Sequence, residues 1–225
     1  HYSRLNRESK STFIRSSYKS ELWFLKDLDR SIKILDLGCG QGILLRYLCY
    51  LGFTSLTGVD ISSSQLEAAE KTLPDSVRLE KDSAIDFLGK NRNAFDLIIS
   101  YDILEHIQED LAPELLELVF GSLKTHGRAI FRTPNMGSLL GIYSRYIDIT
   151  HKTGYTEYSL MQLLDASPFS GNYKLFAPSY GILSKKWFAE RLNFLISAIL
   201  FKIQFRSIPR FLDKNLLAYA EKRSK

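Results

Sequence analysis

Apolar and polar residues alternate in blocks along this chain of 225 residues. Short runs rich in Leu, Ile and Val predict buried parallel strands, and the amphipathic segments between them predict helices. The predicted strands are 32–37, 55–60, 77–82, 95–100 and 127–134, and the predicted helices are 42–52, 62–73, 83–90 and 109–123. Strand–helix alternation at this spacing predicts an α/β fold, a Rossmann-like, doubly wound and mostly parallel sheet with helices on both faces.

The two ends of the chain depart from this alternation. Residues 1–30 predict an N-terminal helical segment, with apolar residues at helical spacing over 11–29. After Pro134, residues 135–158 are aperiodic and rich in Tyr and Gly, which indicates a lid loop. A helix (159–166), a strand (172–178), a helical insertion (179–213) and an antiparallel closing strand (215–222) follow. We therefore predict one domain, 1–225, built on seven strands.

Composition narrows the class of protein. Hydrophobic residues make up 45% and charged residues 24%, as in ordinary globular proteins. Two cysteines are too few for a disulfide framework and fit a reducing, cytoplasmic compartment. A net charge of +5 is mildly basic, and it suits an anionic surface such as phospholipid headgroups or a phosphorylated partner, or only a solvated surface. Because the chain starts with His1 and not Met, we expect it to be part of a longer product or to begin after trimming.

The block ILDLGCGQG at 34–42, which follows Ile32 and Lys33, carries the strongest chemical signal. Three glycines directly after a predicted strand allow a ligand to approach the backbone, because no Cβ stands in the way. Asp60 ends the second strand, where a carboxylate can accept hydrogen bonds from a ribose diol. Ile61 can cover an adenine face, and Asp82 with Ser83 can bind an exocyclic amine. These strand ends suit an adenosine.

Asp36 decides between two adenosine ligands. A carboxylate in the first turn repels the pyrophosphate of a dinucleotide and attracts the amino-acid end of S-adenosylmethionine. Position 43 is Ile, so the third glycine of the dinucleotide motif is missing. The sequence favours S-adenosylmethionine over NAD.

Four blocks, ILDLGCGQG, GVDIS, KDS and FDLIISYDILEHI, together resemble class I S-adenosylmethionine-dependent methyltransferases over residues 30–135. The resemblance implies an enzyme that methylates an acceptor. Nucleic acid is not the expected acceptor, because the chain lacks the Asn/Asp-Pro-Pro-aromatic block used on exocyclic amines. The resemblance implies that the cofactor is bound by Asp36, Gly38, Cys39, Gly40, Gly42, Asp60, Ile61, Asp82, Ser83, Ser100 and Tyr101.

Two histidines are the candidate catalytic residues. An oxygen nucleophile usually needs a base, and His106 follows the fourth strand while His151 lies in the lid loop. Asp102, Glu105 and His106 also have the spacing of one helical face and can hold Mg²⁺. The block resembles the metal-binding stretch of ubiquinone-biosynthesis O-methyltransferases, but LEHI is also found in this fold without a metal. We keep both alternatives open.

The acceptor is less defined than the cofactor. Tyr143, Arg145, Tyr146 and Tyr155 of the lid loop offer aromatic and hydrogen-bonding groups for a sugar or an aromatic ring. The lid resembles methyltransferases of polysaccharide and lipid-linked glycan biosynthesis. We expect O-methylation of a sugar or glycolipid precursor. A lipophilic quinone-type ring is the second alternative, and a cofactor-binding module without activity in a larger protein is the third.

The insertion contains the apolar stretch WFAERLNFLISAILFKIQF, surrounded by basic residues. A basic amphipathic helix over 185–206 can pack on its own domain, pair with a second copy in a homodimer, or lie on a membrane surface. No run of about 18 uninterrupted apolar residues indicates a membrane-spanning helix.

Overall fold

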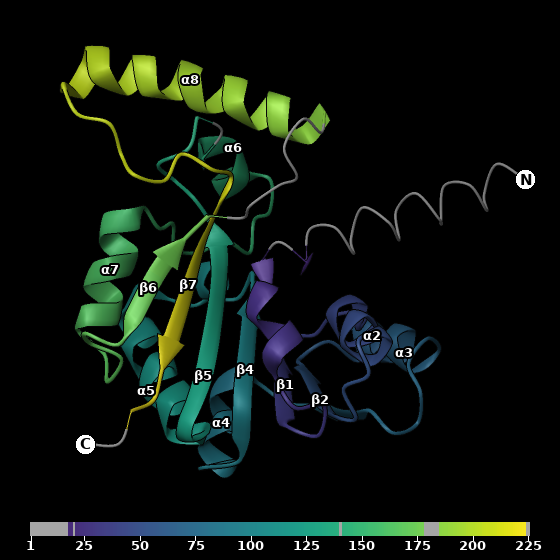
Figure 1. Ribbon diagram of the computed structural model, residues 1–225. Helices are drawn as coiled ribbons and strands as arrows, with labels where there is room; N and C mark the ends of the chain where they lie inside the picture. Colours follow the sequence, from purple (N-terminus) through teal and green to yellow (C-terminus); the bar gives the residue numbers. More distant parts are fainter. Residues whose placement is uncertain (1–17, 20, 140, 178–184, 224–225) are drawn as a thin grey trace, which may run out of the picture.

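The computed structural model describes residues 18, 19, 21–139, 141–177 and 185–223, with the side chains of 185–187 and 190 left out of the description. One seven-stranded sheet forms its centre, in the order β3-β2-β1-β4-β5-β7-β6 (Figure 1). The strands are β1 (Lys33–Leu37), β2 (Ser55–Asp60), β3 (Arg78–Lys81), β4 (Phe95–Tyr101), β5 (Leu123–Pro134), β6 (Tyr173–Phe176) and β7 (Asn215–Glu221). β1 to β5 pair in parallel, and β7 pairs antiparallel with β5 and with β6. The predicted fold and its antiparallel closing strand are confirmed.

Helices lie on both faces of the sheet. The α-helices are α2 (Ile43–Tyr50), α3 (Ser63–Glu70), α4 (Ala84–Lys90), α5 (Ala112–Ser122), α6 (Gly141–Tyr146), α7 (Glu157–Asp165) and α8 (Lys185–Phe205). The 3₁₀-helices are η1 (Trp23–Asp27), η2 (Leu104–His106) and η3 (Glu109–Leu111). In the described part of the chain, no helix combines the length and apolar character that crossing a bilayer requires.

The hydrophobic core has two layers, one on each face of the sheet. Ile34, Leu97 and Ile99 pack with residues of η1, α2 and α3. Leu35 and Ile98, their neighbours along the strands, pack on the opposite face with residues of α4, α5 and α7. Side chains of a strand alternate between faces, so a strand that is buried on both sides is continuously apolar. This explains why runs such as IKILDL predict central strands correctly.

Several predicted elements differ in detail. The strand predicted at 127–134 already begins at Leu123. The helix predicted at 109–123 begins as η3, and α5 follows with Leu111 at its N-cap position. The lid loop 135–158 contains the short helix α6. Of the leading segment, residues 1–17 and 20 lie outside the described residues, and 23–27 form a 3₁₀-helix.

Candidate functional site

The glycine loop follows β1 at the point where the strand order reverses. Successive strands run outward from β1 on one side and from β4 on the other, so their carboxyl ends flank a crevice in which open α/β sheets bind ligands. Gly38, Gly40 and Gly42 all have left-handed backbone conformations. A Cβ on Gly38 would lie 2.0 Å from Cδ1 of Ile103, and the positive φ of this residue disfavours any side chain, so a larger residue would be strained there. The loop therefore presents bare backbone to the crevice.

Asp60 at the end of β2 holds this loop in place. Its Oδ2 accepts a hydrogen bond from the backbone N–H of Gly40 at 2.8 Å, and its Oδ1 accepts one from that of Ser62 at 2.9 Å. Ile61, beside it, has 71% of its surface exposed. A carboxylate oxygen accepts more than one hydrogen bond, so Asp60 keeps acceptor capacity for a ligand while it fixes the loop.

Asp36 is a buried acid at the end of β1. Its side chain is 3% exposed, and its Oδ2 has no hydrogen-bond partner among the described residues. Burial raises the pKa of this carboxyl to about 7; nearby Arg132 opposes the shift and Asp60 adds to it. On the adjacent strand β4, the buried hydroxyl of Ser100 also lacks a partner among the described residues. Two buried polar atoms without partners at adjacent strand ends indicate a ligand that would complete them.

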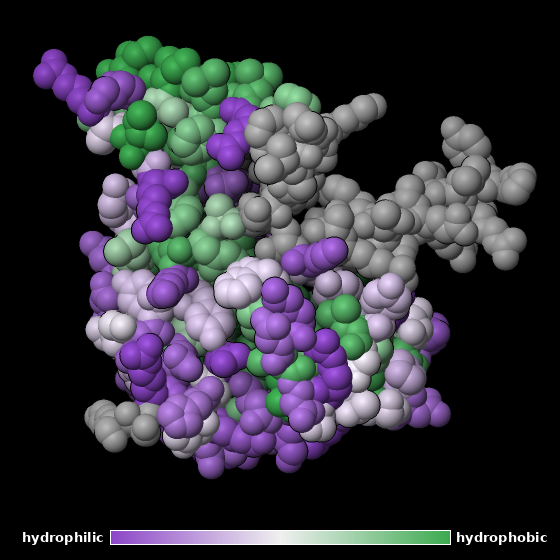
Figure 2. Space-filling model, in the orientation of Figure 1, coloured by the Kyte–Doolittle hydropathy of each residue, from purple (hydrophilic) through white to green (hydrophobic). Residues whose placement is uncertain are grey.

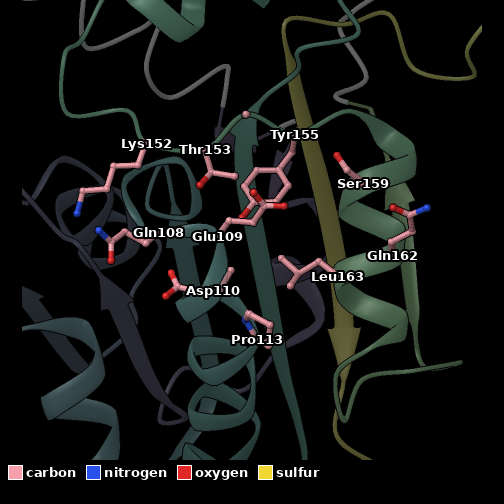
Figure 3. A pocket seen from close by; sticks show the side chains of 12 residues that line it. Gln108, Glu109, Asp110, Pro113, Lys152, Thr153, Tyr155, Ser159, Gln162 and Leu163 are labelled. Atoms are coloured by element: carbon pink, nitrogen blue, oxygen red, sulfur yellow. The ribbon is translucent and has the colours of Figure 1, made fainter.

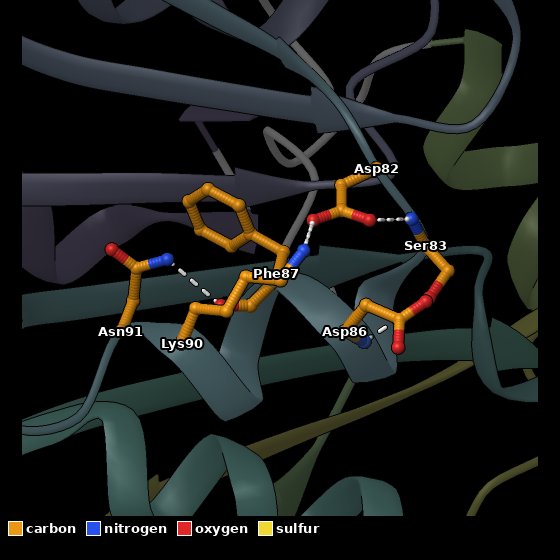
Figure 4. Close-up of polar contacts among 6 residues, drawn as sticks. All are labelled: Asp82, Ser83, Asp86, Phe87, Lys90 and Asn91. Atoms are coloured by element: carbon orange, nitrogen blue, oxygen red, sulfur yellow. Dashed lines mark hydrogen bonds and ion pairs between the residues drawn. The ribbon is translucent and has the colours of Figure 1, made fainter.

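Asp82 and Ser83 follow β3 and are already engaged (Figure 4). Asp82 accepts hydrogen bonds from the backbone N–H of Ser83 at 2.9 Å and from Nζ of Lys90 at 2.8 Å. The Ser83 hydroxyl caps α4, where it accepts from the backbone N–H of Asp86 at 3.1 Å. Lys90, which sequence reasoning missed, helps to lower the pKa of Asp82 and keeps it an acceptor.

A partly buried ionic cluster borders the crevice on the β5 side, and sequence reasoning missed it. The Arg132 guanidinium binds Glu21 at 3.0 Å and is paired through two nitrogens with Asp102. It also lies 4.2 Å above the centre of the Tyr101 ring. The Tyr101 ring in turn lies 6.2 Å from that of Tyr18. An Arg within the apolar strand GRAIFRTP was the signal available in the sequence.

The two candidate catalytic histidines meet in space. The rings of His106, at the end of η2, and His151, in the lid loop, are 4.8 Å apart in an edge-to-face arrangement. The Nδ1 of His106 lies 3.0 Å from the Thr150 hydroxyl and 3.3 Å from the Thr150 carbonyl oxygen. The Nδ1 of His151 lies 2.8 Å from the carbonyl oxygen of Ser144. Because a carbonyl only accepts, both Nδ1 atoms carry the proton in the neutral ring and both Nε2 atoms are left as acceptors.

The structure does not keep together the residues named as a possible Mg²⁺ ligand set. Asp102 has a left-handed backbone and is paired with Arg132, so it does not share a helical face with Glu105 and His106. Among the described residues, Glu105, His106 and His151 offer ligand atoms that lie within 4.8 Å of one another. One carboxylate with two imidazoles does not fit Mg²⁺, which prefers oxygen ligands.

Glu105 connects the lid loop to η2. It is 2% exposed, accepts a hydrogen bond from the Thr133 hydroxyl at 3.1 Å, and has a pKa raised to about 7 chiefly by burial. Its carbonyl oxygen accepts from the backbone N–H of Lys152 at 2.7 Å and of Thr153 at 3.1 Å. These contacts bind the segment after His151 to the segment that carries His106, and so hold the two rings together.

The four predicted acceptor residues do not form one pocket. Tyr143 and Tyr146 are 63% and 76% exposed on α6, and Arg145 donates to the carbonyl oxygens of His151 and Lys152. Tyr155 is 4% exposed and lines a cavity of about 690 Å³ with Glu109 and other residues (Figure 3). Its hydroxyl has no partner among the described residues, and burial raises its pKa to about 12.

The remaining predicted residue is Cys39, inside the glycine loop. It is buried, and its pKa is raised by burial and by the nearby carboxylates Asp36 and Asp60. A thiol in this state is a weak nucleophile and serves as a packing residue.

Comparison with known proteins identifies the family. The chain matches the family model described as "Methyltransferase domain" over residues 12–174. It is 32% identical to a ubiquinone biosynthesis O-methyltransferase of Pelagibacter ubique over 81 residues, 36% of this chain and 33% of that protein. It is 26% identical to one of Colwellia psychrerythraea over 171 residues, 64% of this chain and 68% of that protein. The chain thus spans only about a third of the first of these relatives.

Solved structures agree on the fold. A SAM-dependent methyltransferase of Archaeoglobus fulgidus superposes with a TM-score of 0.68 at 20% identity and covers 99% of this chain and 100% of that one. The plantazolicin methyltransferase BpumL, solved with a desmethylPZN analog and SAH, superposes with a TM-score of 0.63 at 23% identity, over 97% and 87% of the two chains. The chain belongs to the methyltransferase domain family, and its fold is that of S-adenosylmethionine-dependent methyltransferases.

Proposed function

We propose that this protein is an O-methyltransferase that uses S-adenosylmethionine and acts on a hydroxyl of a lipophilic ring. The observation that carries the proposal is the His106–His151 pair, whose rings lie 4.8 Å apart beyond the end of β4. S-adenosylmethionine supplies a methyl group on a positively charged sulfur. The protein has to orient the acceptor hydroxyl, remove its proton and exclude water.

The crevice at β1 is the proposed cofactor site. Asp36 would bind the ammonium group of the methionine end, because a buried carboxylate without a partner is completed by a cation. Asp60 would accept from the ribose hydroxyls with the lone pairs that its backbone contacts leave free. Ile61 and the pair Asp82–Ser83 would border the adenine. Ser100 and Tyr101 would close the crevice on the β4 side.

The histidine pair is the proposed base. The Nε2 atoms of His106 and His151 are acceptors in the neutral rings, and either can take the hydroxyl proton as methyl transfer proceeds. The carbonyl oxygen of Ser144 fixes the tautomer and direction of His151, as a second-layer acceptor commonly does for a catalytic imidazole. No step needs a metal ion in this scheme.

A lipophilic ring is preferred over a sugar as the acceptor. Relatives that match this chain are named ubiquinone biosynthesis O-methyltransferases, and the comparisons give no support to a sugar or glycolipid acceptor. The lid exposes an apolar and aromatic group suited to such a ring, with Ile142 at 77%, Tyr146 at 76% and Ile149 at 99% exposed.

Single substitutions of the histidines test this function. We expect His106→Gln and His151→Gln to lower kcat for methylation of a catechol that carries a short isoprenoid chain by about 10²–10⁴-fold in at least one variant, as loss of a general base does. Calorimetry should show unchanged binding of S-adenosylhomocysteine, because the Nδ1 hydrogen bonds of both rings are made with Thr150 and Ser144 and not with the glycine loop. His126→Gln is the matched control. His126 lies on β5, and its backbone N–H donates a hydrogen bond to the carbonyl oxygen of Lys222.

Two outcomes contradict the proposal. If both variants keep full kcat, the histidine pair is not the base. If wild-type protein binds S-adenosylhomocysteine but methylates neither ring nor sugar acceptors, the alternative of a cofactor-binding module without activity is supported.

A further inference from the structure

Helix α8 exposes its apolar residues, whereas an ordinary amphipathic helix of a soluble protein buries them. Its apolar residues at helical spacing face away from the protein, and each is 42–74% exposed. These residues form the apolar face of α8: Phe188, Leu192, Leu195, Ile196, Ile199 and Ile203. The opposite side buries Ser197, at 1% exposed, and Ala198, at 8%. Water alone does not stabilise such an arrangement, because a soluble helix normally turns its apolar stripe inward.

The apolar surface extends beyond the helix. In Figure 1, α8 crosses the end of the sheet at which β4 and β5 finish, and α6 lies at the same end. Ile142, Ile147 and Ile149 of α6 and the loop after it are 62–99% exposed. Figure 2 shows hydrophobic residues gathered along α8 on the face in view, whereas the opposite end of the molecule is mostly hydrophilic. Exposed apolar side chains gathered at one end of a molecule in this way indicate an interaction site.

The net charge of α8 and the residues after it indicates what kind of surface the apolar face would bind. Residues 185–210 contain six Lys and Arg and one Glu, a net charge of +5 that equals the net charge of the whole chain. Helical spacing places Arg191 and Lys202 at the margin of the apolar face, and Arg206 and Arg210 follow the helix. A second copy of the chain would bring equal positive charges together, which costs free energy. An anionic lipid surface accepts both the apolar face and its basic margin.

We propose that α8 docks the protein on an anionic membrane surface, with the helix lying in the headgroup layer and its apolar face in the lipid. A helix of 21 residues is about 30 Å long, so it gives an extended line of contact. This deepens the proposed function, since the lid with α6 would then open toward lipid that holds a lipophilic ring. The docking itself does not require methyl transfer.

Vesicle flotation of the full chain tests the proposal. We expect binding to vesicles of phosphatidylcholine with phosphatidylglycerol, weaker binding to phosphatidylcholine alone, and loss of the difference at high salt. Each basic side chain near an anionic surface adds roughly fivefold to the binding constant. The charge reversal Lys202→Glu/Arg206→Glu should therefore weaken binding by about tenfold or more, and Leu192→Glu/Ile199→Glu should remove it.

Matched controls separate docking from general effects. Met161→Glu changes an exposed apolar residue of α7, and Lys71→Glu an exposed lysine after α3, and both should bind vesicles as wild type does. All variants should keep their Tm and their binding of S-adenosylhomocysteine, so failure of docking is distinguished from failure of the cofactor site. Equal flotation of wild type and both α8 variants, or no flotation of wild type, would overturn the proposal. A vesicle-free dimer that Leu192→Glu/Ile199→Glu dissociates would instead assign the face to a second copy.

Discussion

At the residue scale, we expect Asp36 to link protein stability, pH and the proposed binding of the cofactor. Its folded-state pKa is about 7, raised by burial from an ordinary value of 3.8. Between these two pH values the folded protein keeps a proton that the unfolded chain has lost, so the contribution of Asp36 to stability falls as pH rises through this window. The ammonium group of the proposed ligand would favour the ionised form of Asp36, so we expect that ligand to bind best when Asp36 has lost its proton.

Asp36→Asn tests this coupling. Relative to wild type, the variant should gain Tm above about pH 7 and gain little at about pH 4, because Asn stays neutral at every pH. Its affinity for S-adenosylhomocysteine should fall, and the increase in wild-type affinity as pH rises through about 7 should disappear. Differential scanning calorimetry and titration calorimetry across this range measure both effects. A variant with wild-type affinity and an unchanged pH profile would exclude Asp36 from the cofactor site.

Arg132 is the second residue at which we expect a single substitution to have a large effect, here on the free energy of unfolding. Its side chain is 16% exposed and joins Glu21, at 4%, to Asp102. Arg132→Met should lower the free energy of unfolding by about 3–5 kcal/mol, because it leaves a buried carboxylate without its partner. Lys124→Met is the matched control. It removes a more exposed ion pair with Asp96 and should cost at most about 1 kcal/mol. Urea unfolding measures both, and similar costs would contradict a special role for the cluster.

At the element scale, β2 and α4 contrast two kinds of glycine. A Cβ on Gly58 of β2 would lie 2.6 Å from Cδ1 of Leu45 and 2.8 Å from Sγ of Cys39, and one on Gly89 of α4 would meet no atom within 4 Å. Gly58→Ala should lose about 1–3 kcal/mol of unfolding free energy through overpacking. Gly89→Ala should gain about 0.5–1 kcal/mol, because alanine favours a helix interior. Denaturant titration checks the signs, and a stabilising Gly58→Ala would show that α2 can shift away from the sheet.

The elements also show which patterns are informative. Strands buried on both faces are continuously apolar, so their positions follow from local sequence. The start of α5 does not follow from local sequence in this way: a 3₁₀ turn precedes the helix, and Leu111 is at the N-cap position. Helix α6 was not predicted from the sequence either. It has only six residues, less than two turns, so its periodicity is too short to recognise.

At the scale of the whole molecule, the sheet closes independently of the insertion. β6 and β7 pair directly with each other, and β7 completes the sheet on β5, although α8 lies between them in sequence. The family model ends at residue 174, before α8. Substitutions on the outer face of α8 should therefore change what the protein binds without unfolding the sheet.

The sequence by itself determined the family, the order of strands and helices, and the residues of the glycine loop, because each depends on local pattern and on glycines at a strand end. Only the tertiary structure decided which distant groups meet. It brought His151 to His106, 45 positions away in the sequence, and Glu21 to Arg132, and it separated Asp102 from the possible metal ligands Glu105 and His106. It also turned the apolar face of α8 outward, because the direction of an amphipathic face depends on packing that no local pattern contains.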